Sequence, residues 1–587
     1  GTTQHAFMRS SMFGVILGGA AAYSPRSTHG AGSHAADVSG NMNGAYTVSS
    51  GGGTTNVPFN SDYASKGHEY FDVWSPEIAT QYAEVFWHDM GPQPLPPAIV
   101  ARFANKTMAI TGYEMDMVMV EPSGAAGRHP ERDVSVPISW AYNHHYEAWM
   151  TGAYSVFGPN EHPDPLDVSH HGGPAKYVAT DTPGARSALG DVPSSLYFSE
   201  GNGGESRKSF HGYPNGFAQL IGSPDSWHIT PMQIDTRNRE CGVTPADIKN
   251  CTKFEAWLEP KSARYGRSHL KEGSPYSGVL ECPCTDRWGG SPIFYPDART
   301  KVNGSNCEHG GRRCDNFTKP CVGPWDGDAA HGGGDLLAQR NPTCWSATYA
   351  GGLRCCRDRH LLLDREQDPG PTLLRYHMKF RFWFEEYRPA TASAPKASHF
   401  HLPRYYYLTE RDAGEYDVPP AFRAPGDPDI PGYDGWPVST EGDMHLTPGS
   451  SCSGGCPHGA DCTCVHTITS RFTIAEGSMI YAGGHCHAPA CISIELYKND
   501  TGVPELLCRQ VSVYGKGDVA VDKFDEEGYV ALPPCLWGAK EEGLQPPVFL
   551  PAGTPMYSVT RTENSRVGHT GQMASWQMRG VPFELKL

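Results

Sequence analysis

The sequence predicts an all-β fold. Glycine and proline are abundant, with 67 and 50 residues in a chain of 587, and this composition is typical of a protein with many turns. No long stretch shows the apolar period of a helix, whereas several segments alternate apolar and polar residues as strands do. The length allows the cores of two or three domains.

The charge balance excludes one class of partner. The chain carries 48 basic and 64 acidic residues, a formal charge of −16. Nucleic-acid binding depends largely on basic side chains that neutralise phosphates, so an acidic chain is not expected to bind nucleic acid. No apolar run approaches the roughly 20 residues that a membrane span needs, so no span is expected.

Cysteines and sequons predict a secreted, disulfide-bonded glycoprotein. The 18 cysteines are even in number and dense in several short segments, as in extracellular proteins. The spacing of Cys452, Cys456, Cys462 and Cys464 also permits a four-cysteine zinc site, but its irregularity favours disulfides. Sequons for N-linked glycans occur at Asn105, Asn250, Asn303, Asn316 and Asn499.

Composition divides the chain into four parts. We expect a glycine- and serine-rich extended arm at residues 1–66, a first β domain at 67–258, a cysteine-rich insertion or linker at 259–366 and a second β domain at 367–587. The insertion has few long apolar runs, so disulfides are expected to stabilise it.

The arm has two interpretations. Residues 8–22 have the short apolar core and small residues of the end of a secretory signal. A glycine-rich arm becomes ordered only if it packs on something, either its own domain or a strand of a neighbouring subunit. The second alternative predicts self-association in an open, head-to-tail assembly.

Alternation along residues 375–384 predicts a half-buried antiparallel strand. The apolar face carries Tyr376, Met378, Phe380, Phe382 and Phe384. Another apolar face is predicted from Met115, Met117 and Met119. Methionine clusters also bind copper, but the core of a sheet is the commoner place for them and is preferred here.

Two histidine pairs are candidate metal ligands. His485 and His487 are one residue apart on a predicted strand, so both side chains point to the same face of the sheet. His144 and His145 are adjacent, so they share a face only at a bulge or at a strand end.

Several motifs, in order over roughly residues 70–580, resemble the plant stress-up-regulated nodulin (SURNod) family. They are Asn143-His144-His145, Gly203-Gly204-Glu205-Ser206-Arg207, Ile234-Asp235-Thr236-Arg237, Tyr349-Ala350-Gly351-Gly352-Leu353-Arg354-Cys355-Cys356, Leu374-Arg375-Tyr376, Gly484-His485-x-His487, Tyr514-Gly515-Lys516-Gly517 and His569-Thr570-Gly571-x-Met573. The arm and the loops near 152–200 and 259–343 lie outside the resemblance. That family is in turn similar to the ascorbate-dependent copper monooxygenases of the peptidylglycine α-hydroxylating and dopamine β types.

The resemblance implies two antiparallel β-sandwich domains, each with one copper site, and so up to two copper ions. The second-domain site would use His485, His487 and Met573, and its soft thioether suits copper that alternates between Cu(I) and Cu(II). The first-domain site would use His144, His145 and the residue at position 232.

A third histidine is expected at position 232, and this chain has Met232 there. His228 lies four residues earlier and would replace it only if the strand shifted. A thioether still ligates Cu(I), although it changes the affinity and potential of the site.

Two hypotheses for function follow. One is a secreted copper monooxygenase that hydroxylates a C–H bond with O2 and ascorbate as reductant. The other, slightly favoured because of Met232, is a non-catalytic extracellular structural or assembly glycoprotein, including a fibril-forming one, that retains a copper site on the same scaffold. No catalytic residue is identified under either hypothesis.

Overall fold

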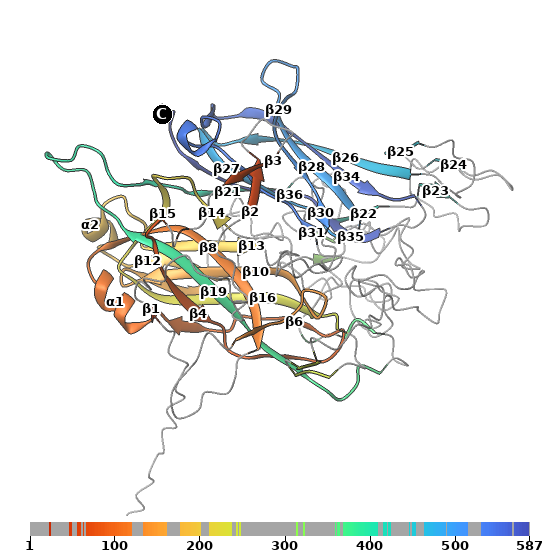
Figure 1. Cartoon of the computed structure of the whole chain (residues 1–587), viewed down its shortest axis with the longest axis horizontal. Coiled ribbons are helices and arrows are strands. Elements are labelled where there is room, and N and C mark those ends of the chain that lie inside the picture. The colour runs from red at the N-terminus through yellow and green to blue at the C-terminus, as the bar shows by residue number, and fades with distance from the viewer. Residues whose placement is uncertain are drawn as a thin grey trace, which may run out of the picture.

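The computed structural model confirms the all-β prediction and shows two β-sandwiches (Figure 1). The described residues are 23–24, 46–49, 56–59, 63, 66–119, 133–160, 177–200, 211–237, 242–244, 246–247, 313–314, 321–322, 359, 361–363, 368–408, 415–418, 421–423, 445–446, 449–453, 463–488, 490–514, 530–565 and 569–585. Among them, none of the helices has the length and apolarity that crossing a bilayer requires.

Two sheets face each other in the first sandwich. In the described part of the chain, the larger sheet contains β1 (Tyr23–Ser24), β4 (Glu69–Trp74), β5 (Ile78–Thr80), β8 (Thr107–Met119), β9 (Val134–Ser135), β14 (His211–Gly212), β15 (Phe217–Gly222), β19 (Leu374–Glu386) and β20 (Phe400–His401). The smaller sheet contains β6 (Val85–Trp87), β7 (Pro92–Pro94), β10 (Ala141–Gly152), β13 (Ser195–Glu200) and β16 (Pro224–Asp235).

The second sandwich repeats this architecture. One sheet contains β2 (Tyr46–Ser49), β3 (Asn56–Phe59), β21 (Arg404–Leu408), β27 (Gly477–His485), β32 (Cys535–Leu536), β33 (Val548–Leu550) and β36 (Ser575–Val581). The facing sheet contains β25 (Ser450–Ser453), β26 (Thr463–Ile474), β28 (Cys491–Lys498), β29 (Glu505–Val511) and β34 (Thr554–Glu563).

The remaining elements are short. They are α1 (Pro97–Phe103), α2 (Ala185–Leu189), the 3₁₀ turn η9 (Lys540–Glu542), and the strand pairs β11 (Ser155–Pro159) with β12 (Tyr177–Asp181), β17 (Arg313–Cys314) with β18 (Cys321–Val322), β22 (Glu415–Val418) with β35 (His569–Met573), β23 (Phe422–Arg423) with β24 (His445–Leu446), and β30 (Val513–Tyr514) with β31 (Val530–Ala531).

β19 lies in the first sandwich, which differs from the predicted boundary at residue 367. It pairs with β4 on one side and with β8 on the other, and Figure 1 shows it as a green strand crossing the orange sheet. The segment between β16 and β19 is therefore an insertion within the first sandwich. An alternating pattern predicts the buried face of a strand, but it does not say which of two similar sheets the strand joins.

The apolar face of β19 lies in the core as predicted, together with Met115, Met117 and Met119 of β8. The opposite face is also buried, which corrects the half-buried prediction. Lys379 lies 3.7 Å from Asp72 and 3.4 Å from Asp133, and the Arg381 guanidinium donates to both carboxylate oxygens of Asp72 at 2.8 and 3.0 Å. Ion pairing compensates the burial of these charges.

The described strands of the N-terminal arm pair within the chain. β1 adds to β4 of the first sandwich, and β2 pairs in parallel with β32 of the second sandwich while β3 completes a hairpin. In Figure 1 the dark red β2 and β3 lie on the blue second unit. These contacts correspond to docking of the arm on its own chain. Self-association stays a prediction.

Apolar contact joins the two sandwiches. A buried cluster contains residues of both units: Tyr213, Phe217, Leu402, Ile480, Tyr481, Leu536, Leu544 and Val581. Beside it, Tyr481 and the ring nitrogen of His211 lie at hydrogen-bond distance, 3.3 Å. The interface therefore fixes the outer face of β27 against the first sandwich.

Replacing Phe380 in the centre of β19 tests the assignment of this strand. The Phe380 ring packs on Tyr146 at 5.0 Å and on Trp227 at 4.9 Å between ring centroids. Phe380→Ala should lower the free energy of unfolding of the first sandwich by about 3–5 kcal/mol, because a large buried ring is lost. Chemical denaturation followed by tryptophan fluorescence measures this effect.

Arg375→Ala on the same strand is the control. The Arg375 side chain is 56% exposed in its ion pair with Glu77, so its loss should change stability by less than about 0.5 kcal/mol. Equal effects of the two substitutions would contradict the placement of β19 in the core.

Candidate metal centre

A β-bulge in β10 orients both histidines of the first pair to one face. Asn143 pairs with Gln233 and His145 pairs with Met232, so the register shifts by one residue at His144. One extra residue on a strand lets two adjacent side chains face the same way. The sequence predicts that His144 and His145 share a face only at a bulge or a strand end, and the structure has a bulge there.

That face points away from the core of the first sandwich. Tyr146, Ala148 and Met150 belong to the core cluster, so His145 has the opposite orientation by strand alternation. Before the bulge, Asn143 bonds across the strands to Gln233 at 2.5 Å. Both histidines are nevertheless buried, His144 at 1% and His145 at 0% exposure.

Met232 lies directly beside this pair. It is opposite His145 on one side and opposite Trp87 of β6 on the other, so the three residues form a row across neighbouring strands. The His145 and Trp87 rings meet edge-on at 5.4 Å. Met232 is fully buried but does not belong to the core cluster, which agrees with an orientation toward the histidines.

His228 does not replace the missing histidine. It pairs with Trp149, lies at 3.1 Å from the Thr151 hydroxyl and stacks on Phe157 at 4.1 Å. Four residues of strand separate it from Met232, about 13 Å at 3.3 Å per residue. The register is regular between these two positions, so the alternative of a shifted strand is wrong.

The second pair begins at the end of β27, with His485 as its last residue and His487 two residues beyond it. A Cβ at Gly484 would meet Gln510, Ile494 and Trp576 inside the second sandwich, so position 484 points into the core. His485 consequently points the other way, toward the first sandwich, and the His487 ring lies on the same side because it contacts His144 and Tyr142. His487 is 1% exposed and His485 is partly buried.

Met573 lies close in sequence to the strand partner of His485. His485, the last residue of β27, pairs with Ser575 of β36, whereas Met573 is the last residue of β35 and pairs with Glu415 of β22. Ala574 and Trp576 belong to the apolar core, whereas Met573 is 1% exposed and lies outside that cluster. Met573 is thus buried outside the apolar core cluster, two residues along the chain from the partner of His485.

The two predicted sites meet at the junction of the sandwiches. The His144 ring lies 5.9 Å from the His487 ring, edge to face, and Tyr142 contacts His487 at 6.2 Å. Within the pairs, the ring centroids are 5.3 Å apart for His144 and His145, and 4.9 Å apart for His485 and His487. The sequence predicted the two pairs, but not that they form one cluster.

The environment keeps the second pair neutral. Burial, together with the neighbouring His144, lowers the pKa of His485 well below its ordinary value. The pKa of His487 is also well below its ordinary value. Burial is the largest cause, and the neighbouring His485 and His144 rings add to it. A neutral imidazole has the lone pair that a metal needs. His485 Nε2 is buried and has no hydrogen-bond partner among the described residues.

Histidines and methionines together provide the ligand types of a copper site. Within the described ranges, no group of three or more histidine, cysteine, aspartate or glutamate side chains is arranged to hold a metal ion. Each half of the cluster instead combines two imidazoles with one thioether, and this mixed set fits copper better than zinc or calcium.

Cys486, which lies between the two histidines of the second pair, is a disulfide partner. It bonds to Cys491 at the start of β28. Cys452 and Cys464 are also joined, across β25 and β26, which supports disulfides over zinc for these two cysteines, and Cys508 is joined to Cys535. The Cys486–Cys491 bond fixes the segment that carries His487.

Two of the five predicted glycosylation sites are described. Asn105 is exposed in the turn after α1, with a positive φ of 57° that asparagine tolerates well. Asn499 follows β28 and is partly exposed. Asn250, Asn303 and Asn316 lie outside the described residues.

The chain was also compared with known proteins. It matches no family model and no curated protein.

Replacing His228 tests the acid sensitivity of the first sandwich. Burial lowers the pKa of His228 to about 4 from an ordinary 6.5, so the unfolded chain binds this proton before the folded chain does. Stability from this group is present above pH 6.5 and is lost as the pH falls toward 4. Thermal unfolding of His228→Gln should show a shallower decline in Tm across that window than wild type.

At pH 7 the variant should be the less stable protein, because it loses the packing on Phe157. The difference in Tm between wild type and the variant should become smaller as the pH falls toward 4. Parallel Tm curves for the two proteins would show that His228 titrates normally in the folded state.

Proposed function

We propose that the protein is an extracellular copper-binding glycoprotein with a structural role, in which copper is held where the two sandwiches meet. The observation that carries this proposal is the contact of His144 with His487, 5.9 Å between ring centroids, across the junction. Because the two ligand sets touch across the junction, copper bound to them would stabilise the packing of the two units against each other.

The ligand chemistry supports copper. Four imidazoles gather at the junction, at His144, His145, His485 and His487. Met232 is the strand partner of His145, and the buried Met573 lies two residues from Ser575, the strand partner of His485. Soft thioethers favour Cu(I), and imidazoles accept both copper oxidation states. The motif resemblance to copper monooxygenases supports the same metal at the same residues, with up to two ions.

Disulfides and sequons support the extracellular setting. The described residues contain disulfides that join β-strands of the second sandwich, and such bonds persist in oxidising compartments. The sequon at Asn105 is on an exposed turn where a glycan has room. Fibril formation and self-association through the arm stay predictions.

Close packing favours a structural over a catalytic role. The His144 and His487 rings are in contact, which leaves no room for a substrate between the two histidine pairs. His144, His145 and His487 are each at most 1% exposed. Met232 also occupies the position of a third histidine.

An ascorbate-dependent monooxygenase is the second candidate. The observation that favours it is the close approach of the His485 and His487 rings, 4.9 Å between centroids, with Met573 buried two residues from Ser575, the strand partner of His485. Copper bound there would supply O2-binding and redox chemistry. Residues of this chain would hold the ion and, through burial, limit its contact with water.

Copper analysis of the purified full chain tests the first proposal. Elemental analysis should find one or two copper ions per chain. Thermal unfolding should show a Tm that rises with added copper, because a ligand that binds only the folded state stabilises it, by about 4 kcal/mol at a thousand times Kd. A folded protein that contains no copper, and whose Tm does not change when copper is added, would exclude this function.

Oxygen consumption separates the two candidates. The structural role predicts copper binding without sustained ascorbate-dependent O2 uptake, whereas the enzyme requires that uptake. Turnover by the copper-loaded chain would favour the monooxygenase.

Substitution of Met573 tests its role as a ligand. Met573→Leu keeps the volume, so the metal-free protein should lose less than about 1.5 kcal/mol of stability, while Cu(I) affinity should fall at least tenfold. Met479→Leu is the matched control, because Met479 of β27 is a buried methionine that belongs to the apolar core of the second sandwich. An equal Cu(I) affinity of both variants would remove Met573 from the site.

A further inference from the structure

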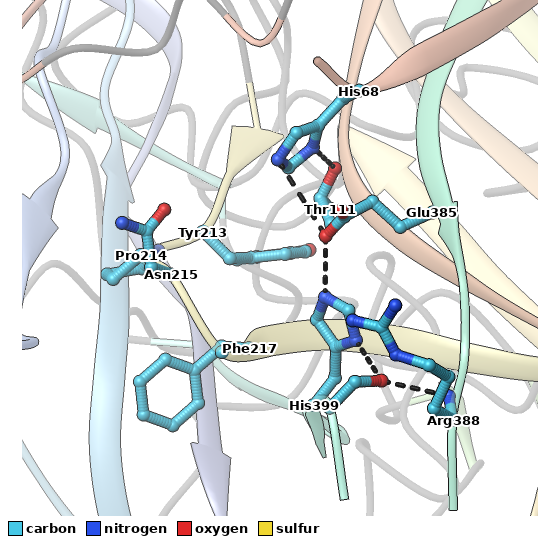
Figure 2. Close-up of a pocket in the computed structure, with 11 residues that line it drawn as sticks. His68, Thr111, Tyr213, Pro214, Asn215, Phe217, Glu385, Arg388 and His399 are labelled. Carbon is cyan, nitrogen blue, oxygen red and sulfur yellow. Dashed lines mark hydrogen bonds and ion pairs between the residues drawn. The ribbon is translucent and has the colours of Figure 1, made fainter. Parts of the chain in front are cut away.

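A polar cavity opens in the first sandwich, away from the histidine cluster. Its volume is about 200 Å³, and it lies among the residue before β4, strand β8, the turn between β14 and β15, and the segment from β19 to β20. Figure 2 shows side chains from these four regions converging on it. The copper proposal does not use these groups, and Tyr213 and Phe217 are the lining residues that also belong to the apolar cluster between the sandwiches.

Five polar side chains in two hydrogen-bonded groups form one wall. The Thr111 hydroxyl lies 2.7 Å from His68 Nδ1, and His68 Nε2 lies 3.8 Å from the Glu385 carboxylate, which is beyond hydrogen-bond distance. On the other side of Glu385, His399 Nε2 lies at 3.0 Å, and the Ser398 hydroxyl lies 2.8 Å from His399 Nδ1. Both rings are thus fixed through their second nitrogen, and Glu385 is held between them (Figure 2).

The charges in this cavity are balanced. A hydrogen bond from His399 lowers the pKa of Glu385, so the carboxylate is ionised at neutral pH. Burial lowers the pKa of His68 to about 4, so this ring is neutral. The guanidinium of Arg388 adds one positive charge to the lining. The Glu385 side chain is 40% exposed, so its oxygens are accessible to a ligand.

Aromatic rings continue from the cavity onto the surface. Phe217 lines the cavity, Phe400 packs on it at 5.8 Å, and Phe583 packs on Phe400 at 5.9 Å. Phe400 is 42% exposed and Phe583 is 43% exposed, which is unusual for rings of this size. The two rings come from different sandwiches and form a continuous apolar strip.

We propose that this cavity binds one ring of a neutral sugar, with further sugar units lying along the phenylalanine strip. A balanced set of donors and acceptors suits hydroxyl groups, which both donate and accept hydrogen bonds. The apolar C–H face of a pyranose packs well on aromatic rings. Pockets that bind drug-sized ligands measure about 300–1,000 Å³, so a smaller cavity of about 200 Å³ suits a single ring.

The site binds the sugar and does not cleave it. Glycoside hydrolysis generally needs two carboxyl groups flanking the bond, about 5–9.5 Å apart. In the part of the lining that the structure describes, Glu385 is the carboxylate present. A binding role also agrees with hydrogen bonds that hold both histidine rings in place.

Saturation-transfer difference NMR on the full chain tests the proposal. The probes are methyl glycosides of glucose, galactose, mannose and arabinose, their disaccharides, and glucuronic acid as the charged analogue. At least one neutral glycoside should bind saturably, at least fivefold more tightly than glucuronic acid. Glu385→Gln should weaken this binding at least tenfold, because an ionised acceptor for hydroxyl groups is lost.

Glu386→Gln is the matched control. Glu386 is the next residue on β19, and its carboxylate pairs with Lys106 at 3.0 Å outside the cavity, so sugar affinity should change less than twofold. Phe400→Ala should lower the affinity for disaccharides at least threefold, while the affinity for the monosaccharide should change less than twofold. Because Phe400 is exposed, this variant should fold.

Three results would overturn the proposal. The first is no saturable binding of any neutral glycoside to a folded wild-type chain. The second is equal binding by wild type and Glu385→Gln. The third is binding of Zn²⁺ alone that disappears in Glu385→Gln while the sugars show none, which would make the His68, Glu385 and His399 group a cation site. None of these results depends on copper.

Discussion

The one-residue bulge in β10 is the constraint on which the candidate metal centre depends. On a regular strand, His144 and His145 would point to opposite faces, and one of them would enter the core. The shift between Asn143 and His145 instead turns both rings toward the second sandwich while Tyr146 keeps its place in the core. The bulge adds one residue to β10 while the sheet stays paired on both sides of it. Both histidines therefore leave the core, and the core residues that follow on β10 keep their packing.

The interface between the sandwiches then decides what the centre can do. Tyr213 and Phe217 of the first unit pack with Ile480 and Tyr481 of the second, so the outer face of β27 has one position relative to β10. His487 contacts His144 as a result. The geometry of the histidine cluster is therefore a property of the interface and not of either sandwich alone. The interface must separate before a substrate could enter between the rings.

Sequence predicted local features well and long-range ones poorly. Alternation identified the core face of β19, and the His-x-His spacing identified two side chains on one face, because both depend on strand periodicity. Choice of sheet is not encoded in that periodicity, so β19 was assigned to the wrong sandwich. No sequence pattern predicted the proposed sugar cavity. His68, Thr111 and Glu385 are distant in sequence and become neighbours only through sheet pairing.

The late position of β19 has a consequence for how the chain is made. Asp72 and Arg381 form their ion pair across 309 residues of sequence. At a synthesis rate of about 5–20 residues per second, the partners of β19 wait roughly 15–60 s for the strand to emerge. During that time β4 and β8 lack the strand that lies between them. The first sandwich consequently closes only after the cysteine-rich insertion has been synthesised, which makes folding slow and exposes unpaired strand edges to aggregation until β19 arrives.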